Sequence, residues 1–309
     1  MKRIMEMLDE AVQMREEYLL GYLITDKGEF LGVMDLNTGE IVKTAPVGWW
    51  VWCAIVYEEK LWLGTEAGVQ EWKRRVPGRV LDEERIDCLS LTIYKGRLWV
   101  LQSDDLGCHV GPVGGELREV VRESGPEHYL HFVDYIITTS EGRAYIQYPE
   151  YPPGDKFVIA EFDMDRGVVG EAIYEGKRNR DVMGTKFEVV EGWILTCGAG
   201  DRIVACHMKT GEEKEVYRAR GYINRFQIKE HYDGFEIIAG DNIEYSEGSL
   251  PSGNSSYLGI VRVDENLNVI EKQKVKLDDV SGISPLLSGG YKLLEVLGEE
   301  NGENSETSG

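Results

Sequence analysis

Long apolar runs are missing from this sequence. No hydrophobic stretch approaches the roughly 20 residues that an α-helix needs to cross a bilayer. The N-terminal segment MKRIMEMLDEAVQMREE carries acidic side chains where a signal peptide would be apolar. We therefore expect no membrane partner and a cytoplasmic location.

Positive charge is scarce relative to negative charge. The chain of 309 residues holds 34 Lys and Arg against 55 Asp and Glu, which gives a formal net charge of −21 at pH 7. Such a surface repels the phosphate backbone of nucleic acids. The charge balance therefore argues against a nucleic-acid partner.

Motifs for metals, cofactors and nucleophiles are missing as well. The five cysteines have no CxxC spacing, which argues against a zinc cluster and a disulfide framework. His128 and His131 have the spacing of a metal-binding pair, but no third ligand accompanies them. The sequence also lacks a Gly-x-Ser-x-Gly elbow, a phosphate-binding loop and a dinucleotide fingerprint. We expect no metal, no cofactor and no catalytic residues.

What the sequence does contain is a repeat of β-rich segments. AIVYEEKLWLGTE (54–66) and LTIYKGRLWVLQS (91–103) each consist of a β-rich run, a short charged or glycine turn and a second β-rich run. Five further segments share this design: 11–23, 136–148, 187–198, 228–240 and 284–298. The repeat predicts seven hairpins of one kind.

A second hairpin follows most of the first ones. EFLGVMDLNTGEIVK (29–43) and RIVACHMKTGEEKEVY (202–217) place polar turn residues between two β-rich runs. Two hairpins make a unit of four strands. These units recur every roughly 37 to 55 residues, close to the spacing of propeller blades.

In this respect the chain resembles the β-propeller superfamily, particularly the PQQ-type and WD-repeat-like propellers. The similarity rests on GRLWV (96–100) and LNTGE (36–40), which follow the glycine-turn and Thr-Gly-Glu style of those blades. The Trp-Asp dipeptide of WD repeats and the Asp box of sialidases are missing. The resemblance implies an architecture and no particular activity.

The chain is thus predicted to form one all-β domain over residues 1–298, a β-propeller of four-stranded antiparallel blades. Seven blades are expected, closed by an N-terminal strand over Arg3–Leu8, and six blades with an extra hairpin are the alternative. The last residues, 299–309, contain no apolar side chain and are expected to form a disordered acidic tail. The predicted blades cover 10–46, 51–83, 88–122, 130–175, 184–218, 224–277 and 284–298.

The start of each blade is the predicted place for a site, because these starts meet around one end of the central channel. Aligning the seven first hairpins gives the residue at each start: Met7, Trp50, Asp87, Val133, Met183, Arg225 and Ser281. Residues that only pack should look alike from blade to blade. This mixed set instead indicates exposure to solvent or to a ligand.

Aromatic residues gather near one of these starts. Trp49 and Trp50 precede a strand, and large aromatic side chains are good anchors for a partner. Trp52 aligns with Leu89 and is expected to be a buried wedge between blades. Tyr148 and Tyr151, in the proline-stiffened loop YPEYPPGD, are expected to extend the aromatic surface.

A basic cluster stands out on this acidic chain. Arg178 and Arg180 lie in GKRNRD (176–181), and Arg225 is expected nearby. Such a group can hold an acidic peptide or an anion by charge-assisted hydrogen bonds.

The leading hypothesis is a non-catalytic binding module for a protein or peptide. Its predicted binding residues are Trp49, Trp50, Asp87, Tyr148, Tyr151, Arg178, Arg180 and Arg225. The alternative is an enzyme or small-molecule binder at the channel mouth, acting on a sugar or lactone with a divalent cation. Its candidate acids are Asp87, Asp201 and Asp241.

Overall fold

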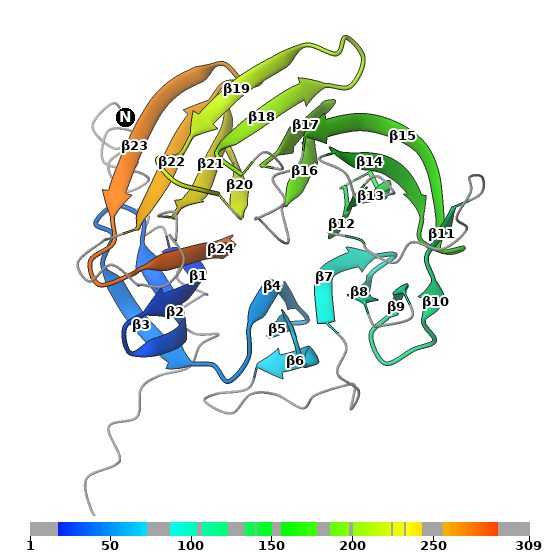
Figure 1. Ribbon diagram of the computed structural model, residues 1–309, viewed down its shortest axis with the longest axis horizontal. Helices are drawn as coiled ribbons and strands as arrows, with labels where there is room; N and C mark the ends of the chain where they lie inside the picture. The colour runs from blue at the N-terminus through cyan, green and yellow to red at the C-terminus, as the bar shows by residue number, and fades with distance from the viewer. Residues whose placement is uncertain are drawn as a thin grey trace, which may run out of the picture.

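The structure is a computed structural model. It describes residues 18–72, 87–103, 107–122, 133, 135–139, 141–149, 156–177, 186–197, 200–223, 225–231, 233–242 and 256–289. Every regular element in these ranges is a β-strand, and the strands form six separate sheets around a central axis (Figure 1). The described residues contain no helix of the length and apolarity needed to span a membrane.

Each sheet is one blade, numbered here from the N-terminal one, and its strands are given from the channel outward. Blade 1 contains β24 (Gly282–Gly289), β1 (Tyr18–Thr25), β2 (Gly28–Asp35) and β3 (Ile41–Pro46). Blade 2 contains β4 (Val51–Tyr57), β5 (Lys60–Thr65) and β6 (Gly68–Trp72). Blade 3 contains β7 (Asp87–Tyr94), β8 (Arg97–Ser103), β9 (Cys108–Pro112) and β10 (Arg118–Glu119).

The second half of the ring has the same construction. Blade 4 contains β12 (Tyr135–Thr138), β13 (Ala144–Pro149), β14 (Lys156–Asp163), β15 (Val168–Lys177) and β11 (Val121–Arg122). Blade 5 contains β16 (Phe187–Val190), β17 (Trp193–Thr196), β18 (Arg202–His207) and β19 (Glu213–Arg218). Blade 6 contains β20 (Phe226–His231), β21 (Gly234–Asp241), β22 (Tyr257–Val263) and β23 (Val269–Lys276). The predicted all-β propeller is confirmed. Four blades have the predicted four antiparallel strands, whereas blade 2 has three described strands and blade 4 has a fifth strand, β11, which is parallel to its neighbour.

The predicted first hairpins owe their shape to their turns. Three of them, at residues 58–59, 95–96 and 191–192, have both central residues at positive φ. Two-residue turns of this kind match the right-handed twist of the flanking strands. The charged and glycine residues between the β-rich runs therefore form the tight turns that the sequence indicates.

The ring closes differently from the prediction. Strand β1 pairs with β2 on one edge and with β24 on the other, so the C-terminal strand takes the innermost position in blade 1. Six blades, the alternative, replace the predicted seven. The predicted closing strand Arg3–Leu8 and the tail 299–309 lie outside the described residues. A single strand that completes another blade has the same local pattern as the first strand of a new blade, which explains the wrong count.

Side chains join the last blade to the closing strand. The Asn242 amide donates to the Ile283 carbonyl oxygen over 3.0 Å, and the Ile283 N–H donates to the Asn242 side-chain oxygen over 2.6 Å. The Gln227 amide donates to the Leu286 carbonyl oxygen over 2.6 Å. Blade 6 is thus fastened to blade 1 by hydrogen bonds that satisfy backbone groups of β24.

The hydrophobic core is divided into six clusters, one between each pair of adjacent blades. The cluster between blades 6 and 1, for example, packs Ile238 and Leu258 against Leu19 and Ile283. The other five join blades 1 and 2, 2 and 3, 3 and 4, 4 and 5, and 5 and 6. Because each sheet buries its two faces against its neighbours, the number of clusters independently agrees with six blades.

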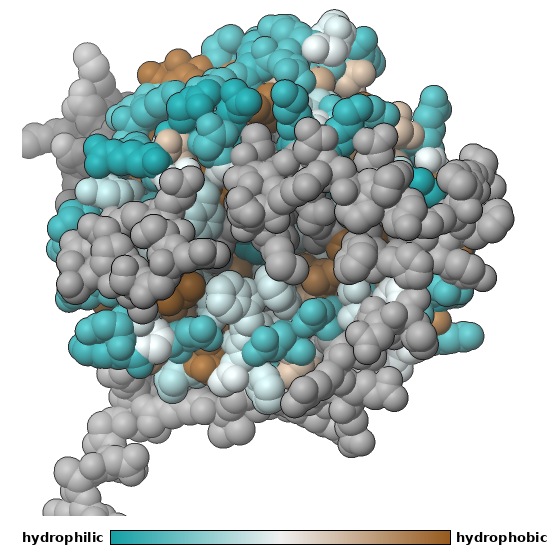
Figure 2. Space-filling view, in the orientation of Figure 1, coloured by the Kyte–Doolittle hydropathy of each residue, from teal (hydrophilic) through white to brown (hydrophobic). Residues whose placement is uncertain are grey.

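The outer edges of blades 4 and 6 are covered and rich in charge, respectively. β11 lies parallel to β15 and covers the outer edge of blade 4, whereas β23 presents mostly exposed charged side chains. Figure 2 shows hydrophilic side chains along much of the rim. Charged or covered edges prevent pairing with another sheet.

Candidate functional site

The six innermost strands β24, β4, β7, β12, β16 and β20 all begin at the same end of the ring. Each pairs with an antiparallel strand that returns to that end; this strand follows directly in the chain in blades 2 to 6, and it is β1 in blade 1. We call this end the channel mouth. Trp50, Asp87, Lys186 and Arg225 stand at the starts of four of these strands.

Arg225 occupies the centre of the channel mouth. It precedes β20 in blade 6, yet its guanidinium carbon lies 5.6 Å from the centre of the Tyr135 ring in blade 4. Its charge also acts on the thiol of Cys53 in blade 2. Neither blade is a neighbour of blade 6, so the side chain reaches across the axis. Only 5% of Arg225 is exposed.

Lys186 provides a second cation and has its own partner. It is 4% exposed, and its ammonium lies 2.5 Å from a Glu188 carboxylate oxygen. Burial acts to lower the pKa of Lys186, but the Glu188 carboxylate outweighs it, and the pKa is raised. The lysine therefore stays charged, and its charge is balanced by Glu188.

The charge of Arg225 has no comparable balance. Among the described residues, no carboxylate lies within 4 Å of its guanidinium. The guanidinium instead makes a cation–π contact with the Tyr135 ring. Removing a charge from water without a counter-charge costs several kcal/mol. A negatively charged ligand at the channel mouth would supply the missing charge.

The opposite side of the channel mouth is aromatic and acidic. The Trp50 backbone N–H donates to a Glu66 carboxylate oxygen over 3.2 Å, and the Trp50 ring centre lies 5.1 Å from that of Tyr22. Burial and the neighbouring Glu66 carboxylate raise the pKa of Asp87, and Trp52 offsets this only in part. Blades 2 and 3 thus present acids where blades 5 and 6 present bases.

The predicted aromatic residues separate into exposed and packed ones. Trp49 is 43% exposed, whereas Trp50 is half-buried against the cluster between blades 1 and 2. Tyr148 is buried between blades 3 and 4, and the Arg122 guanidinium covers its ring at 4.5 Å. Tyr148 therefore does not extend an exposed surface from Trp49, contrary to expectation. Tyr151 lies outside the described residues.

The remaining predicted positions have varied surroundings. Val133 is buried in the cluster between blades 3 and 4, and the Ser281 hydroxyl donates to the Ile24 carbonyl oxygen over 2.9 Å. Both have structural roles. The predicted residues Met7, Arg178, Arg180 and Met183 lie outside the described residues.

The alignment of Trp52 with Leu89 is correct, but the expected burial of Trp52 is wrong. Both residues sit at a break in strand register, a β-bulge, at the same place in blades 2 and 3. Val51 and Cys53 on either side are buried in interblade clusters, while Trp52 is half-buried and belongs to none of them. The bulge turns the extra residue out of the packed face.

Two of the three acids proposed for the alternative function are engaged elsewhere. Asp241 is 2% exposed, lies 2.6 Å from the Lys274 ammonium and accepts from the Tyr217 hydroxyl over 2.9 Å. Asp201 lies 2.7 Å from the Arg218 guanidinium. Within the described ranges, no group of three or more His, Cys, Asp or Glu side chains is arranged for a metal ion.

Lys186, Tyr135 and Cys53 were missed by the sequence alignment. The alignment steps back seven positions from each turn and so assumes inner strands of equal length. β4 has seven residues, but β16 has only four, and the start of blade 5 therefore shifts from Met183 to the neighbourhood of Lys186. The alignment did not account for the β-bulge, which adds one residue to β4 and to β7 and makes them longer than β16.

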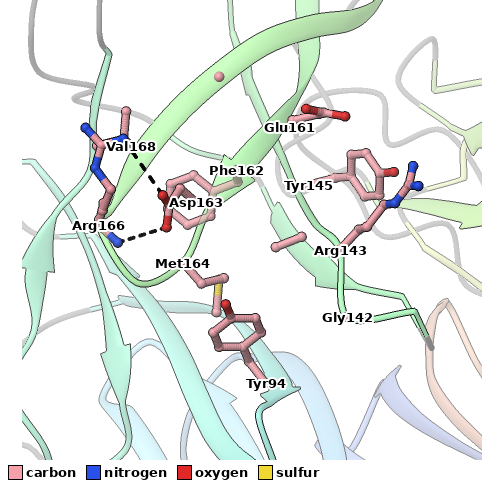
Figure 3. Close-up of a pocket in the computed structure, with 12 residues that line it drawn as sticks. Tyr94, Gly142, Arg143, Tyr145, Glu161, Phe162, Asp163, Met164, Arg166 and Val168 are labelled. Carbon is pink, nitrogen blue, oxygen red and sulfur yellow. Dashed lines mark hydrogen bonds and ion pairs between the residues drawn. The ribbon is translucent and has the colours of Figure 1, made fainter.

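A separate cavity of about 480 Å³ lies at the opposite end of blades 3 and 4 (Figure 3). Two of its charged side chains, Asp163 and Arg166, pair with each other. The Asp163 carboxylate accepts from the Arg166 backbone N–H over 3.1 Å and faces the Arg166 guanidinium at 4.0 Å. The channel mouth, with its buried cation lacking a counter-charge, is the stronger candidate for a site.

No protein-family model matches the chain, and no curated protein matches it. Solved structures that are similar to it include the following two. The extracellular domain of the putative one component system BT4673 from B. thetaiotaomicron has 13% identity and a TM-score of 0.46, over 84% of this chain and 35% of that one. The computationally designed Ika8 protein has 10% identity and a TM-score of 0.42, over 83% and 90%. The chain thus spans about a third of the first of these proteins. The propeller assignment rests on the strand pairing described above.

Proposed function

We propose that this protein is a non-catalytic binding module whose channel mouth takes an acidic segment of a protein partner, with Arg225 binding a carboxylate. The observation that carries the proposal is the buried guanidinium of Arg225, which has no carboxylate within 4 Å among the described residues. A carboxylate from a ligand supplies the counter-charge that this arginine lacks. Paired and charge-assisted hydrogen bonds make this contact strong and directional.

The rest of the channel mouth favours one orientation of the segment. Glu66 and Asp87 repel a carboxylate on the side of blades 2 and 3, while Lys186 and Arg225 attract it on the side of blades 5 and 6. The exposed Trp49 offers an apolar anchor at the rim. Charge complementarity of this kind selects a partner and its register more than it adds raw affinity.

The test uses the full chain and a displayed library of random peptides. Selected peptides are expected to contain Asp, Glu or a free C-terminus, and fluorescence anisotropy then measures their affinities. Arg225→Met is expected to weaken binding by about tenfold or more, as the loss of one charged contact implies. Arg218→Met is the matched control, because this exposed arginine pairs with Asp201 and Glu215 on the surface. Equal binding by Arg225→Met would refute the proposal.

A small carboxylate is the second candidate, because the close enclosure of Arg225 suits a compact ligand. The same full chain is tested by thermal shift with acetate, succinate and citrate. A small ligand raises the melting temperature by mass action at concentrations above its dissociation constant. A shift that is lost in Arg225→Met, without selection of any peptide, assigns the site to small carboxylates.

A further inference from the structure

Two buried thiols meet at the interface between blades 2 and 3. Cys53 lies in β4 and Cys88 in β7, and these innermost strands of neighbouring blades share one hydrophobic cluster. Cys53 is 4% exposed and Cys88 is fully buried. Both are free thiols.

Gly64 shows how close the two sulfurs are. This glycine pairs with Cys53 in the ladder between β4 and β5. A Cβ atom at Gly64 would stand 2.4 Å from the Cys53 sulfur and 2.7 Å from the Cys88 sulfur. The separation of the sulfurs therefore cannot exceed the sum of these two distances. Glycine leaves room for the thiol pair that any other residue would displace.

The two thiols differ in their electrostatic surroundings. Burial opposes ionisation of Cys53, but the hydrogen bond from the Cys88 thiol and the positive charge of Arg225 outweigh it and lower the pKa of Cys53. Burial and the neighbouring Cys53 raise the pKa of Cys88. The pair thus consists of one thiol that ionises more readily than the other. This is the asymmetry of a nucleophilic and a resolving cysteine.

We propose that Cys53 and Cys88 are a peroxide-sensitive dithiol that closes to a disulfide across the blade 2–blade 3 interface. In the first step the Cys53 thiolate attacks the O–O bond of a hydroperoxide. This yields a sulfenic acid on Cys53 and, after proton uptake, an alcohol or water. In the second step the Cys88 sulfur attacks the Cys53 sulfur and expels water. Two thiols are oxidised to one disulfide, and one peroxide is reduced.

The disulfide also changes the channel mouth. It replaces the Cys53 thiol, whose pKa the Arg225 charge lowers, by a group that cannot ionise. The proposed dithiol rests on the close approach of the two sulfurs, and the pKa difference only assigns their roles. It holds whether or not Arg225 binds a carboxylate, and its test does not involve any ligand of the channel mouth.

The test treats the folded full chain with hydrogen peroxide, blocks free thiols with an alkylating agent and digests the protein without reduction. The expected product is a peptide pair linked through Cys53 and Cys88 with the loss of two hydrogens. Cys108, Cys197 and Cys206 serve as internal controls, since each is buried away from this pair and should remain alkylated after denaturation. A linkage between any other two cysteines would overturn the proposal.

The repeat supplies matched variants. The bulge alignment makes Ser90 the equivalent of Cys53 and Val51 the equivalent of Cys88, so Cys53→Ser and Cys88→Val introduce residues that neighbouring blades already hold. Cys88→Val is expected to accumulate sulfenic acid on Cys53, detected by a dimedone adduct, and Cys53→Ser is expected to leave Cys88 reduced. If peroxide leaves both thiols of the wild-type chain fully alkylatable, at concentrations that oxidise free cysteine, the proposal is wrong.

Discussion

Blade 6 contains two buried charged residues, Asp241 and Arg225, and their surroundings differ. At the last residue of β21, the buried Asp241 carboxylate has the Lys274 ammonium, the Tyr217 hydroxyl and the Arg220 backbone N–H as partners. At the start of β20, the Arg225 guanidinium is also buried, and its neighbours among the described residues are the Tyr135 ring, thiols and the Lys186 ammonium, with no carboxylate within 4 Å. Both residues come from one sheet, and only one is fully paired.

The contrast separates structural from functional polar groups. A buried charge with every hydrogen bond made holds blades together, because removing it leaves its partners unsatisfied. A buried charge without a counter-charge lowers stability, and its presence needs another explanation. The proposed explanation for Arg225 is a ligand at the channel mouth, whereas the paired Asp241 has a structural role.

The largest expected effect comes from removing the closing strand. Deleting residues 281–309 exposes the edge of β1 and takes Ile283 and Leu286 from the clusters on both sides of blade 1. We expect the cooperative thermal transition, measured by circular dichroism, to be lost. Deleting only 299–309 is the control and should leave the transition in place. A cooperative transition in the longer deletion would show that the ring does not depend on β24.

Asp241→Ala should have the next largest effect. It leaves the Tyr217 hydroxyl, the Lys274 ammonium and a backbone N–H without their acceptor, at an expected cost of about 3 kcal/mol in the free energy of unfolding. Urea denaturation measures this cost. Asp201→Ala is the matched control, because its pair with Arg218 is exposed and such pairs contribute about 0 to 1 kcal/mol. Equal losses of unfolding free energy in the two variants would show that the buried Asp241 contributes no more than an exposed ion pair.

Arg225→Met should change the free energy of unfolding little. Any change should be an increase, whereas Asp241→Ala lowers it. Replacing an unbalanced buried charge by an apolar side chain of similar length removes a desolvation penalty and loses one cation–π contact of about 1 kcal/mol. We expect the free energy of unfolding to stay within about 1 kcal/mol of the wild-type value. A loss as large as that of Asp241→Ala would make Arg225 a structural residue.

The smallest expected effect is a pH dependence from Asp87. Its folded pKa is raised above the unfolded value by burial and by Glu66. The protonated folded form is therefore favoured at low pH, and this contribution is lost as the pH rises through the folded pKa. Asp87→Asn should match the wild-type chain below pH of about 3.9 and be slightly more stable at neutral pH. Urea midpoints of both chains across this pH range measure the difference. A difference that narrows with rising pH would contradict the raised pKa of Asp87.

Much of the fold could be predicted because its signals are local. The turns at 58–59 and 95–96, the alternation of the strands and the equivalence of Trp52 with Leu89 all lie within one or two hairpins of sequence. The blade limits near 51 and 88 are close to the observed strand starts for the same reason. The channel-mouth position of Arg225 also follows from this alignment, although its burial does not.

Other features could not be predicted because they depend on lengths and distant contacts. The bulges make the inner strands unequal, which displaced the predicted start of blade 5 from Lys186. Tyr148 has the pattern of a loop aromatic, but its side chain packs between two blades under Arg122. Neither fact is visible in a single repeat.

The sequence by itself determined the repeating strand–turn–strand units, because turn chemistry and the two-residue period of a strand act between near neighbours. Only the tertiary structure decided that residues 282–289 complete the first blade, and that the ring has six blades. It alone brought Arg225, Tyr135 and Cys53 together from blades 6, 4 and 2. These residues meet because ring closure directs every innermost strand toward one axis, a constraint that acts between segments far apart in the chain.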